Sequence, residues 1–287
     1  MPEPLLLETI AETKAWARAE SRAGRSIGFV PTMGALHAGH RSLIERARQE
    51  NDRVIVSIFV NPTQFGPNED FRKYPRTLVA DLKVCEQAGA DAVFSPESKE
   101  MYLDDARTWV DVGGLTDTLC GLSRPGHFRG VCTVVAKLFN IVRPDRAYFG
   151  RKDAQQLRVI EAMNRDLNFG IEIVPCDIVR ESDGLAMSSR NRYLTPEQRR
   201  QALCLSHALN RCRASIQAGH RDALKLIAEM TESIRQQPDA EIDYIQIVDA
   251  DTLKDVERVE GTVLVALAVK IGTTRLIDNL RITVDPG

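Results

Sequence analysis

SIGFVPTMGALHAGHRSLIERARQENDRVIVSIFV, residues 26–60, decides the fold class of this chain. Its first apolar run predicts a buried strand over Ser26–Pro31. The apolar spacing of Arg41–Glu50 is helical, and the almost wholly apolar run Arg53–Val60 is typical of a parallel strand covered on both faces. A strand, a helix and a second strand in this order indicate a parallel sheet with a right-handed crossover.

The same alternation of strands and helices continues along the first half of the chain. We expect, in order, the helix Leu78–Ala88 ended by Gly89, the strand Asp91–Phe94, the helix Val131–Val142, the strand Arg146–Phe149, the helix Ala154–Leu167 and the strand Ile171–Val174. This order predicts an α/β fold built on a doubly wound parallel sheet.

The order of predicted helices and strands changes after Gly184. Two polar amphipathic helices, Thr195–Ile216 and Arg221–Gln236, precede three short strands, Tyr244–Val248, Thr262–Val269 and Thr274–Ile277. Because no helices separate these strands, we expect a smaller α+β domain. We place the boundary between Val179 and Met187, which gives domains 1–183 and 184–287.

Composition and charge narrow the function classes. The 287 residues are 43% hydrophobic and 27% charged, which is ordinary for a globular protein and argues against disordered and membrane classes. With a formal charge of −2, the chain has no excess of basic residues that would indicate nucleic acid as its main partner. No apolar run reaches the ~20 residues that span a bilayer, and MPEPLLLETIAETKAWARAE resembles the start of an amphipathic helix more than a signal peptide.

The 6 cysteines are widely scattered and form no C-x-x-C pair. Zinc knuckles and redox motifs therefore have no support, and buried thiols in a reducing compartment are the natural interpretation. We expect a cytoplasmic protein with neither nucleic-acid nor membrane partners.

The loop Pro31–His40 (PTMGALHAGH) joins the first predicted strand to its helix. Gly34 and Gly39 would let backbone approach phosphate closely, and the helix N-terminus adds partial positive charge. His37 and His40 fall on one helix face, where two imidazoles can donate hydrogen bonds to phosphate oxygens. The alternatives are an ordinary turn with two surface histidines, or a two-histidine metal site, for which no third ligand is obvious nearby.

The loop Met187–Arg190 (MSSR) is a second candidate for binding phosphate. Ser188 and Ser189 supply hydroxyls and N–H groups, and the Arg190 guanidinium can grip phosphate through two hydrogen bonds. A serine-rich hinge with one solvated arginine is the alternative. Paired with the histidine loop, the pattern resembles the HIGH…KMSKS arrangement of nucleotidyltransferases, with arginine where lysine is usual.

The segment Phe149–Gln156 (FGRKDAQQ) follows a predicted strand and opens a helix. Its candidates are Gly150 for the turn, Lys152 for phosphate, Asp153 for a helix cap or Mg²⁺, and Gln155 and Gln156 for a hydroxyl or carboxylate. A capped helix with solvated charges is the alternative, and it applies most to Arg151 and Gln155.

Two further loops offer substrate contacts. In Val60–Phe65 (VNPTQF), Asn61 and Gln64 place uncharged polar groups at the end of the second strand, although a polar turn is the commoner meaning of Asn-Pro. In the predicted loop RPGHF before the Val131–Val142 helix, Arg124 and His127 are candidate anion contacts. An ordinary basic loop explains those two almost equally well.

Seven blocks together resemble the pantothenate synthetase (pantoate–β-alanine ligase) family of the HIGH-type nucleotidyltransferase superfamily. They are PTMGALHAGH, SIFVNPTQF, YPRT, SRPGHFRGV, FGRKDAQQL, GLAMSSRNRYLT and TRLIDN, in the family's order and across nearly the whole chain. The resemblance implies a Rossmann-like nucleotidyltransferase domain, a small C-terminal lid domain and a homodimer. It also implies that pantoate attacks Mg-ATP to give pantoyl adenylate and pyrophosphate, and that β-alanine then displaces AMP to give pantothenate.

Site residues follow from the resemblance, position by position. Assigned to ATP are Pro31, Met33, Gly34, Ala35, Leu36, His37, Ala38, Gly39, His40, Gly150, Arg151, Lys152, Asp153, Val179, Met187, Ser188, Ser189 and Arg190. Among these, His40, His37, Lys152 and Arg190 are the catalytic candidates, and Asp153 is the candidate for Mg²⁺. Gln64 and Gln156 match the pair that holds pantoate, and Asn61 and Arg124 join them as substrate candidates. Ala154 departs from the family, which usually carries an aromatic residue there.

Two other functions compete with this interpretation. A cytidylyltransferase or tRNA-charging enzyme would share the loops, but the chain lacks the basic surface and the extra domain that tRNA needs. A nucleotide-binding regulator would bind ATP without pantoate-dependent release of pyrophosphate.

Overall fold

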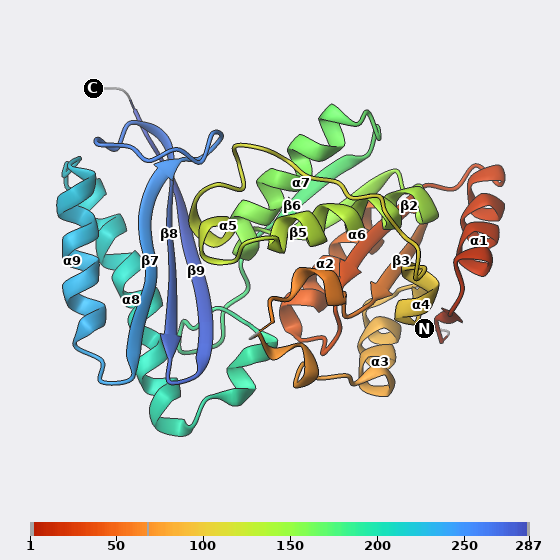
Figure 1. Ribbon diagram of the computed structural model, residues 1–287, viewed down its shortest axis with the longest axis horizontal. Helices are drawn as coiled ribbons and strands as arrows, with labels where there is room; N and C mark the ends of the chain where they lie inside the picture. The colour runs from red at the N-terminus through yellow and green to blue at the C-terminus, as the bar shows by residue number, and fades with distance from the viewer. Residues whose placement is uncertain (1–2, 68, 286–287) are drawn as a thin grey trace. The chain divides into compact units, whose positions relative to one another are not determined.

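The computed structural model describes residues 3–67 and 69–285, and its contacts divide the chain into two compact units (Figure 1). The first unit contains the chain up to Gly113, with Arg124–Arg151 and Gln156–Asp177. The second contains Gly114–Ser123, Lys152–Gln155 and the chain from Ile178 onward. The predicted domain boundary at 183/184 stays a prediction. No helix in the described ranges is both long and apolar enough to cross a membrane.

The first unit is built on a six-stranded parallel sheet in the order β1-β4-β3-β2-β5-β6. The strands are β1 (Leu5–Leu7), β2 (Ile27–Thr32), β3 (Arg53–Ile58), β4 (Ala92–Phe94), β5 (Arg146–Gly150) and β6 (Glu172–Cys176). The predicted doubly wound sheet is confirmed. Because the order reverses between β2 and β5, the carboxyl ends of these two neighbours form the switch point where ligands of such sheets bind.

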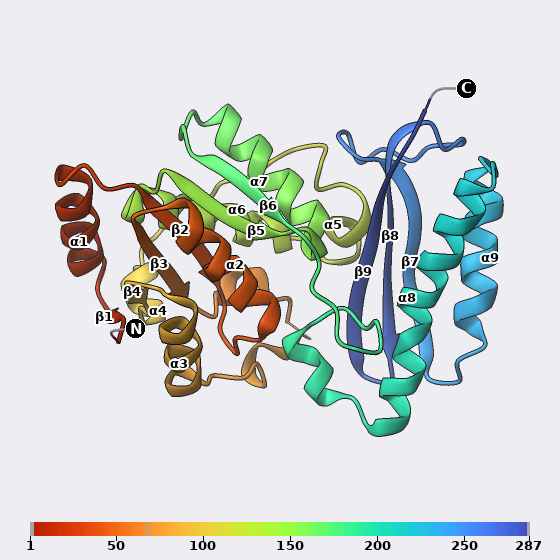
Figure 2. The same cartoon turned by 180° about the vertical axis from the view of Figure 1, so that it is seen from behind.

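Helices cover the sheet on both faces (Figure 2). They are α1 (Ile10–Arg22), α2 (Ala38–Glu50), α3 (Leu78–Ala88), α4 (Ser98–Met101), α6 (His127–Val142) and α7 (Ala154–Asp166), with short 3-10 turns at Pro62–Gln64, Asp70–Arg72 and Arg151–Asp153. The apolar sides of α2 and α3 pack with β2, β3 and β4 in one buried cluster. The helix α1 packs against α6 and β2.

Two local predictions were wrong. The run Leu5–Leu7, which was expected to open a helix, is a strand parallel to β4, and the helix starts only after Thr9 caps it. A run of three leucines is compatible with a helix or a strand, so the pairing with β4 determined that it forms a strand. The helix α6 begins at His127 rather than Val131, so the second part of RPGHF is helical.

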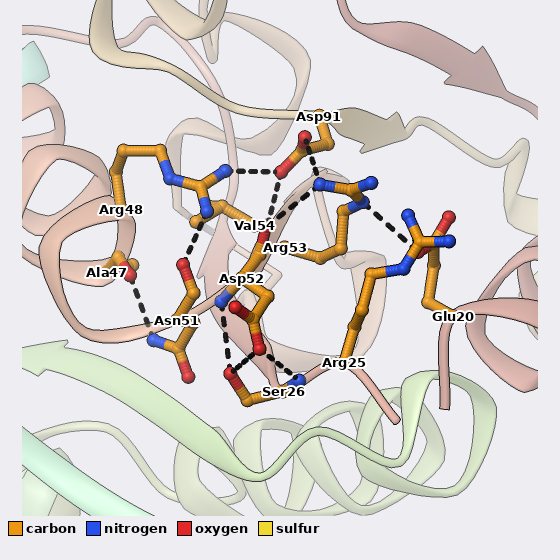
Figure 3. A network of polar contacts seen from close by, with 10 residues as sticks. All are labelled: Glu20, Arg25, Ser26, Ala47, Arg48, Asn51, Asp52, Arg53, Val54 and Asp91. Atoms are coloured by element: carbon orange, nitrogen blue, oxygen red, sulfur yellow. Dashed lines mark hydrogen bonds and ion pairs between the residues drawn. The ribbon is translucent and has the colours of Figure 1, made fainter. Parts of the chain in front are cut away.

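Acidic side chains fasten the amino ends of β2 and β3 (Figure 3). A carboxylate oxygen of Asp91 accepts hydrogen bonds from the backbone N–H of Val54 at 2.7 Å and from Arg48 at 2.7 Å. Asp52 accepts from the N–H of Ser26 at 3.0 Å. This network fixes the sheet at the end opposite to the switch point.

The second unit contains a three-stranded antiparallel sheet in the order β7-β8-β9 and two long helices. The elements are α5 (Leu119–Ser123), a 3-10 turn Ser189–Tyr193, α8 (Pro196–Gln217), α9 (Ala223–Arg235), β7 (Ala240–Asp249), β8 (Gly261–Ile271) and β9 (Thr274–Val284). The strand β9 runs to Val284, well beyond the predicted Ile277, because it pairs with β8 along its whole length.

Each face of this sheet has its own apolar cluster. On one face, side chains of α8 and α9 pack against alternate residues of β8, such as Val265 and Leu267. On the other, Leu264 and Ala266 pack with Leu119 and Ala154. The start of α7 and the segment 114–123 therefore belong with the C-terminal sheet, although they lie far from it in the sequence.

Candidate active site

The loop 31–40 leaves β2 through an unusual backbone turn. Gly34 and Ala35 both have positive φ, at 86° and 50°, and Ala35 lies in a left-handed conformation that side chains usually avoid. The Asp81 carboxylate compensates for this strain, because its two oxygens accept hydrogen bonds from the N–H groups of Ala35 (3.0 Å) and Leu36 (2.8 Å). Asp81 is 2% exposed and also accepts from the Thr77 hydroxyl at 3.1 Å. One buried acid on α3 therefore holds the loop in shape.

His37 and His40 come together at the N-terminus of α2, as the sequence predicts. Their ring centroids are 4.1 Å apart. The His37 Nδ1 accepts from the Gly39 N–H at 3.1 Å, and the His40 Nδ1 accepts from the His37 N–H at 3.4 Å. In a neutral ring these bonds assign the proton to Nε2, so each imidazole presents an N–H donor at Nε2.

The backbone of this loop differs from a glycine-rich phosphate cradle. The N–H groups of Ala35, Leu36, His37 and Gly39 all donate within the protein. These four amides are therefore already engaged within the protein and do not form such a cradle.

Met33, Asn61 and Gln64 form a second group, at the carboxyl ends of β2 and β3. The Gln64 side chain accepts from Asn61 Nδ2 at 3.0 Å and donates to the Met33 sulfur at 3.1 Å. The Asn61 carbonyl oxygen in turn accepts from the Tyr102 hydroxyl at 2.8 Å. Asn61 and Gln64 are 1% and 8% exposed, so two of the substrate candidates are buried, oriented amides.

Arg124 joins this group through the backbone of Gln64. Its guanidinium donates to the Gln64 carbonyl at 3.3 Å, and His127 Nδ1 lies 2.8 Å from the same oxygen. Arg124 also binds both carboxylate oxygens of Glu69 at 2.6 Å. Burial alone would raise the pKa of Glu69, but the hydrogen bond and charge of Arg124 outweigh it and hold that pKa below its usual value.

A close approach between α6 and this group requires glycine at position 130. A Cβ there would lie 2.4 Å from the Thr63 carbonyl oxygen and 2.7 Å from the Gln64 nitrogen, both backbone atoms that cannot move aside independently. The Gly130 carbonyl also accepts from Asn61 at 3.2 Å. The glycine lets α6 seat the strand-end turn that carries Gln64.

The segment after β5 contains candidates with different surroundings. Lys152 and Gln156 are half-buried and Asp153 is exposed. Gln155 is 6% exposed, and its amide donates to the carbonyls of Leu115 (2.9 Å) and Thr118 (2.8 Å). Gln155 therefore anchors the 114–123 segment and is not a solvated group of a capped helix. Gly150 ends β5, and Arg151 lies 3.4 Å from Asp177 in an exposed pair.

Residues 179–190 of the second unit form one hydrogen-bonded segment. The Met187 N–H donates to the Val179 carbonyl at 3.0 Å, and Ser188 caps the turn Ser189–Tyr193 by accepting from the Arg190 N–H at 3.2 Å. Asn191 then donates to Glu181 at 2.7 Å. The ATP candidate Val179 and the phosphate candidates Met187–Arg190 are thus parts of one local structure.

A resident metal centre has no support in residues 3–67 and 69–285. They contain no group of three or more histidine, cysteine, aspartate or glutamate side chains placed to hold a metal ion.

The sequence interpretation missed the residues that support these loops. Asp81 could have been noticed from the sequence. It shares one face of the predicted helix with Leu78, Leu82 and Cys85, and a carboxylate on a buried apolar face is unusual. Glu69 and Tyr102 gave no such signal, since their partners are distant in the chain.

The comparisons with known proteins agree along nearly the whole chain. A family model described as pantoate-beta-alanine ligase matches residues 5–281. The pantothenate synthetase of Moorella thermoacetica is 59% identical over 280 residues, covering 98% of this chain and 99% of the relative. That of Acetivibrio thermocellus is 57% identical over 279 residues, covering 97% and 99%.

Solved structures give the same answer. Pantothenate synthetase from Thermus thermophilus matches with a TM-score of 0.92 at 45% identity, covering 98% of this chain and 100% of that one. Pantoate-beta-alanine ligase from Francisella tularensis, described as complexed with beta-gamma ATP and beta-alanine, matches with a TM-score of 0.77 at 35% identity, covering 96% and 97%. By its sequence, its parallel sheet and its paired histidines, this chain belongs to the pantoate–β-alanine ligase family, whose members are ligases that make pantothenate.

Proposed function

We propose that this enzyme joins pantoate to β-alanine in two steps through a pantoyl-adenylate intermediate, with Mg-ATP as a substrate. The observation that carries the proposal is the pair His37 and His40, whose Nε2 donors stand at the helix N-terminus beside the switch point. The Francisella tularensis relative, described as complexed with beta-gamma ATP and beta-alanine, supports ATP and β-alanine as two of the substrates.

In the first step, a pantoate carboxylate oxygen attacks the α-phosphorus of ATP. The bond from that phosphorus to its bridging oxygen breaks, and pyrophosphate leaves with the electron pair. Charge gathers on the non-bridging oxygens and on the leaving group, so positioning and fixed positive charge dominate the chemistry. His37, His40, Lys152 and Arg190 are the side chains to which we assign that stabilisation.

In the second step, the β-alanine amine attacks the activated carbonyl carbon. The bond between that carbon and the AMP oxygen breaks, AMP leaves, and the nitrogen loses a proton as the amide forms. We assign pantoate to Gln64 and Gln156, and β-alanine to Gln64. Asn61 supports the Gln64 amide through its 3.0 Å hydrogen bond, which fixes which end of that amide accepts.

Asp153 is our candidate for a carboxylate that contacts the Mg²⁺ of Mg-ATP, since it is exposed and directly follows Lys152. The ion would neutralise phosphate charge when bound. We further propose that the enzyme is a homodimer and works in the cytoplasm. None of the 6 cysteines, all in the described part of the chain, forms a disulfide, as a reducing compartment predicts.

Mixing enzyme, Mg-ATP and pantoate with and without β-alanine tests the order of steps. We expect pyrophosphate in both mixtures, and AMP and pantothenate only when β-alanine is present. Release of pyrophosphate only in the presence of β-alanine would exclude a free adenylate step. Replacing ATP by CTP separates this proposal from a cytidylyltransferase, and light scattering gives the oligomeric state.

A further inference from the structure

Two neighbouring polar residues on β9, Asp278 and Asn279, are buried. They are 3% and 7% exposed, in a strand that otherwise buries apolar side chains on the same stretch. A buried carboxylate and a buried amide are costly unless they are hydrogen-bonded. Their partners therefore indicate what the two residues do.

The two side chains point to opposite faces of the sheet. Asp278 shares a face with Leu276 and Leu280, which belong to the cluster under α8 and α9. Asn279 lies across from Ala266, on the face that packs against the start of α7. Two adjacent positions in β9 thus reach the two faces of the sheet, one on each face.

Asp278 binds the segment that contains Val179. Its carboxylate accepts two hydrogen bonds from Arg180, at 2.7 Å and 2.9 Å. Arg180 also donates to the Gly184 carbonyl at 3.1 Å, and its backbone pairs with Ala186. These contacts join the two ends of the turn between Val179 and Met187.

Asn279 binds the backbone of Lys152, another ATP candidate of the second unit. Its side-chain amide donates to the Lys152 carbonyl at 2.8 Å. Its own backbone N–H donates to Asp278 at 2.8 Å, so the two buried residues are also joined to each other. The backbone at Lys152 is thereby fixed to the same strand as the 179–187 turn.

Stability alone gives a poor account of this arrangement. A buried ion pair adds little net stability, and apolar residues of similar size often replace such pairs without loss. A leucine at position 278 would continue the apolar face of Leu276 and Leu280. Orientation is the better explanation, since two hydrogen bonds from a planar guanidinium specify a geometry.

We propose that Asp278 and Asn279 are positioning residues for ATP, which hold the Val179 and Lys152 segments at a fixed spacing. This inference rests on the proposed assignment of Val179 and Lys152 to ATP. In this proposal both residues act indirectly, by holding the segments that contain Val179 and Lys152, to which we assign the ATP contacts.

Steady-state kinetics of adenylate formation in the full-length enzyme test the role. Asn279→Asp keeps the size but replaces the donor to Lys152 by an acceptor, and Asp278→Asn removes the charge that pairs with Arg180. For each we expect the KM for ATP to rise about 10-fold, the range of one hydrogen bond to a buried group, while the KM for pantoate is unchanged. Should Asp278→Asn not fold, the double variant with Arg180→Gln, which leaves no unpaired charge, takes its place.

The matched control is Asp243→Asn, which removes the 2.7 Å ion pair between β7 and Arg275 of β9. We expect it to lower the melting temperature without changing the KM for ATP. A similar rise in that KM in the control, or none in either test variant, would overturn the positioning role. Lys152→Ala separates the two proposals: if it leaves ATP kinetics unchanged, the assignment of Lys152 fails and this inference falls with it. If it impairs them and Asn279→Asp does not, only this inference fails.

Discussion

The ATP candidates of the two units are held in place in different ways. In the first unit, the loop 31–40 is braced by Asp81 of α3, which binds the consecutive N–H groups of Ala35 and Leu36. In the second unit, the segments at Lys152 and Val179 are braced by Asp278 and Asn279 of β9. Sequence motifs identify the loops in both units, whereas the braces come from the fold.

The largest effect we expect comes from the first unit, because we assign transition-state stabilisation to the histidines of its loop 31–40. His40→Ala removes one Nε2 donor and should lower the rate of adenylate formation by about 10²–10³-fold, the scale of one lost electrostatic contact. The measurement is ATP–pyrophosphate exchange in the presence of pantoate. Arg41→Ala, which removes only an exposed pair with Glu45, is the control. Near-normal exchange in His40→Ala would contradict the assigned role.

A smaller loss of exchange activity should follow from a substitution in the loop Met187–Arg190 of the second unit. Arg190→Ala removes a guanidinium from the predicted phosphate loop, and we expect exchange to fall by about 10- to 100-fold, as for one charged hydrogen bond. Arg192→Ala, in the same turn and exposed, should leave the rate unchanged. If the two arginine variants lose activity equally, the second unit contributes general charge rather than a specific contact.

The brace of the first unit can be tested separately from its histidines. Asp81→Asn turns one acceptor into a donor that faces a backbone N–H, and should cost about 1–3 kcal/mol of unfolding free energy. We also expect the KM for ATP to rise about 5-fold, the effect of roughly 1 kcal/mol. Chemical denaturation and exchange kinetics measure the two effects.

The control for this brace is Asp145→Asn, since the Asp145 carboxylate accepts from the Ile27 N–H at 2.7 Å at the other end of β2. It should lower stability without raising the KM for ATP. A parallel rise in both variants would mean that Asp81 supports the sheet in general and not the loop.

The smallest effect concerns the pair between Glu69 and Arg124. Because the folded-state pKa of Glu69 is lowered, its contribution to stability is present above its unfolded pKa of about 4.3 and is lost as pH falls through the folded value. Glu69→Gln should therefore cost less than about 1 kcal/mol near neutral pH, as a partly exposed pair does, and nothing at about pH 2. Denaturation of both proteins across this range checks it, and a pH-independent difference would argue against the ion pair as its source.

Much of the fold could be predicted because its signals are local. In β2, α2 and β3, the spacing of apolar residues stays regular over enough residues to identify each element as a strand or a helix. Gly89, with φ of 90°, ends α3 as predicted. The three residues of β1 and the first turn of α6 were misassigned, because short apolar or polar stretches take their structure from distant partners.

The candidate site divides in the same way. His37, His40, Asn61 and Gln64 stand at strand ends and helix starts, so spacing and chain order were enough to group them. Asp278 and Asn279 lay inside a block that the resemblance pointed out, but their partners, Arg180 and Lys152, depend on which face of β9 each side chain occupies. That information appears only when the register of the sheet is known.

The position of β9 in the chain has a consequence for how the enzyme is made. Synthesis proceeds from the N-terminus, and domains begin to fold as they emerge. The parallel sheet and the Asp81 brace can form while the C-terminal strands are still being translated. The bonds from Asp278 and Asn279 cannot form until β9 has emerged. A nascent chain should therefore complete its histidine loop first and order its lysine segment only after this strand has joined the sheet.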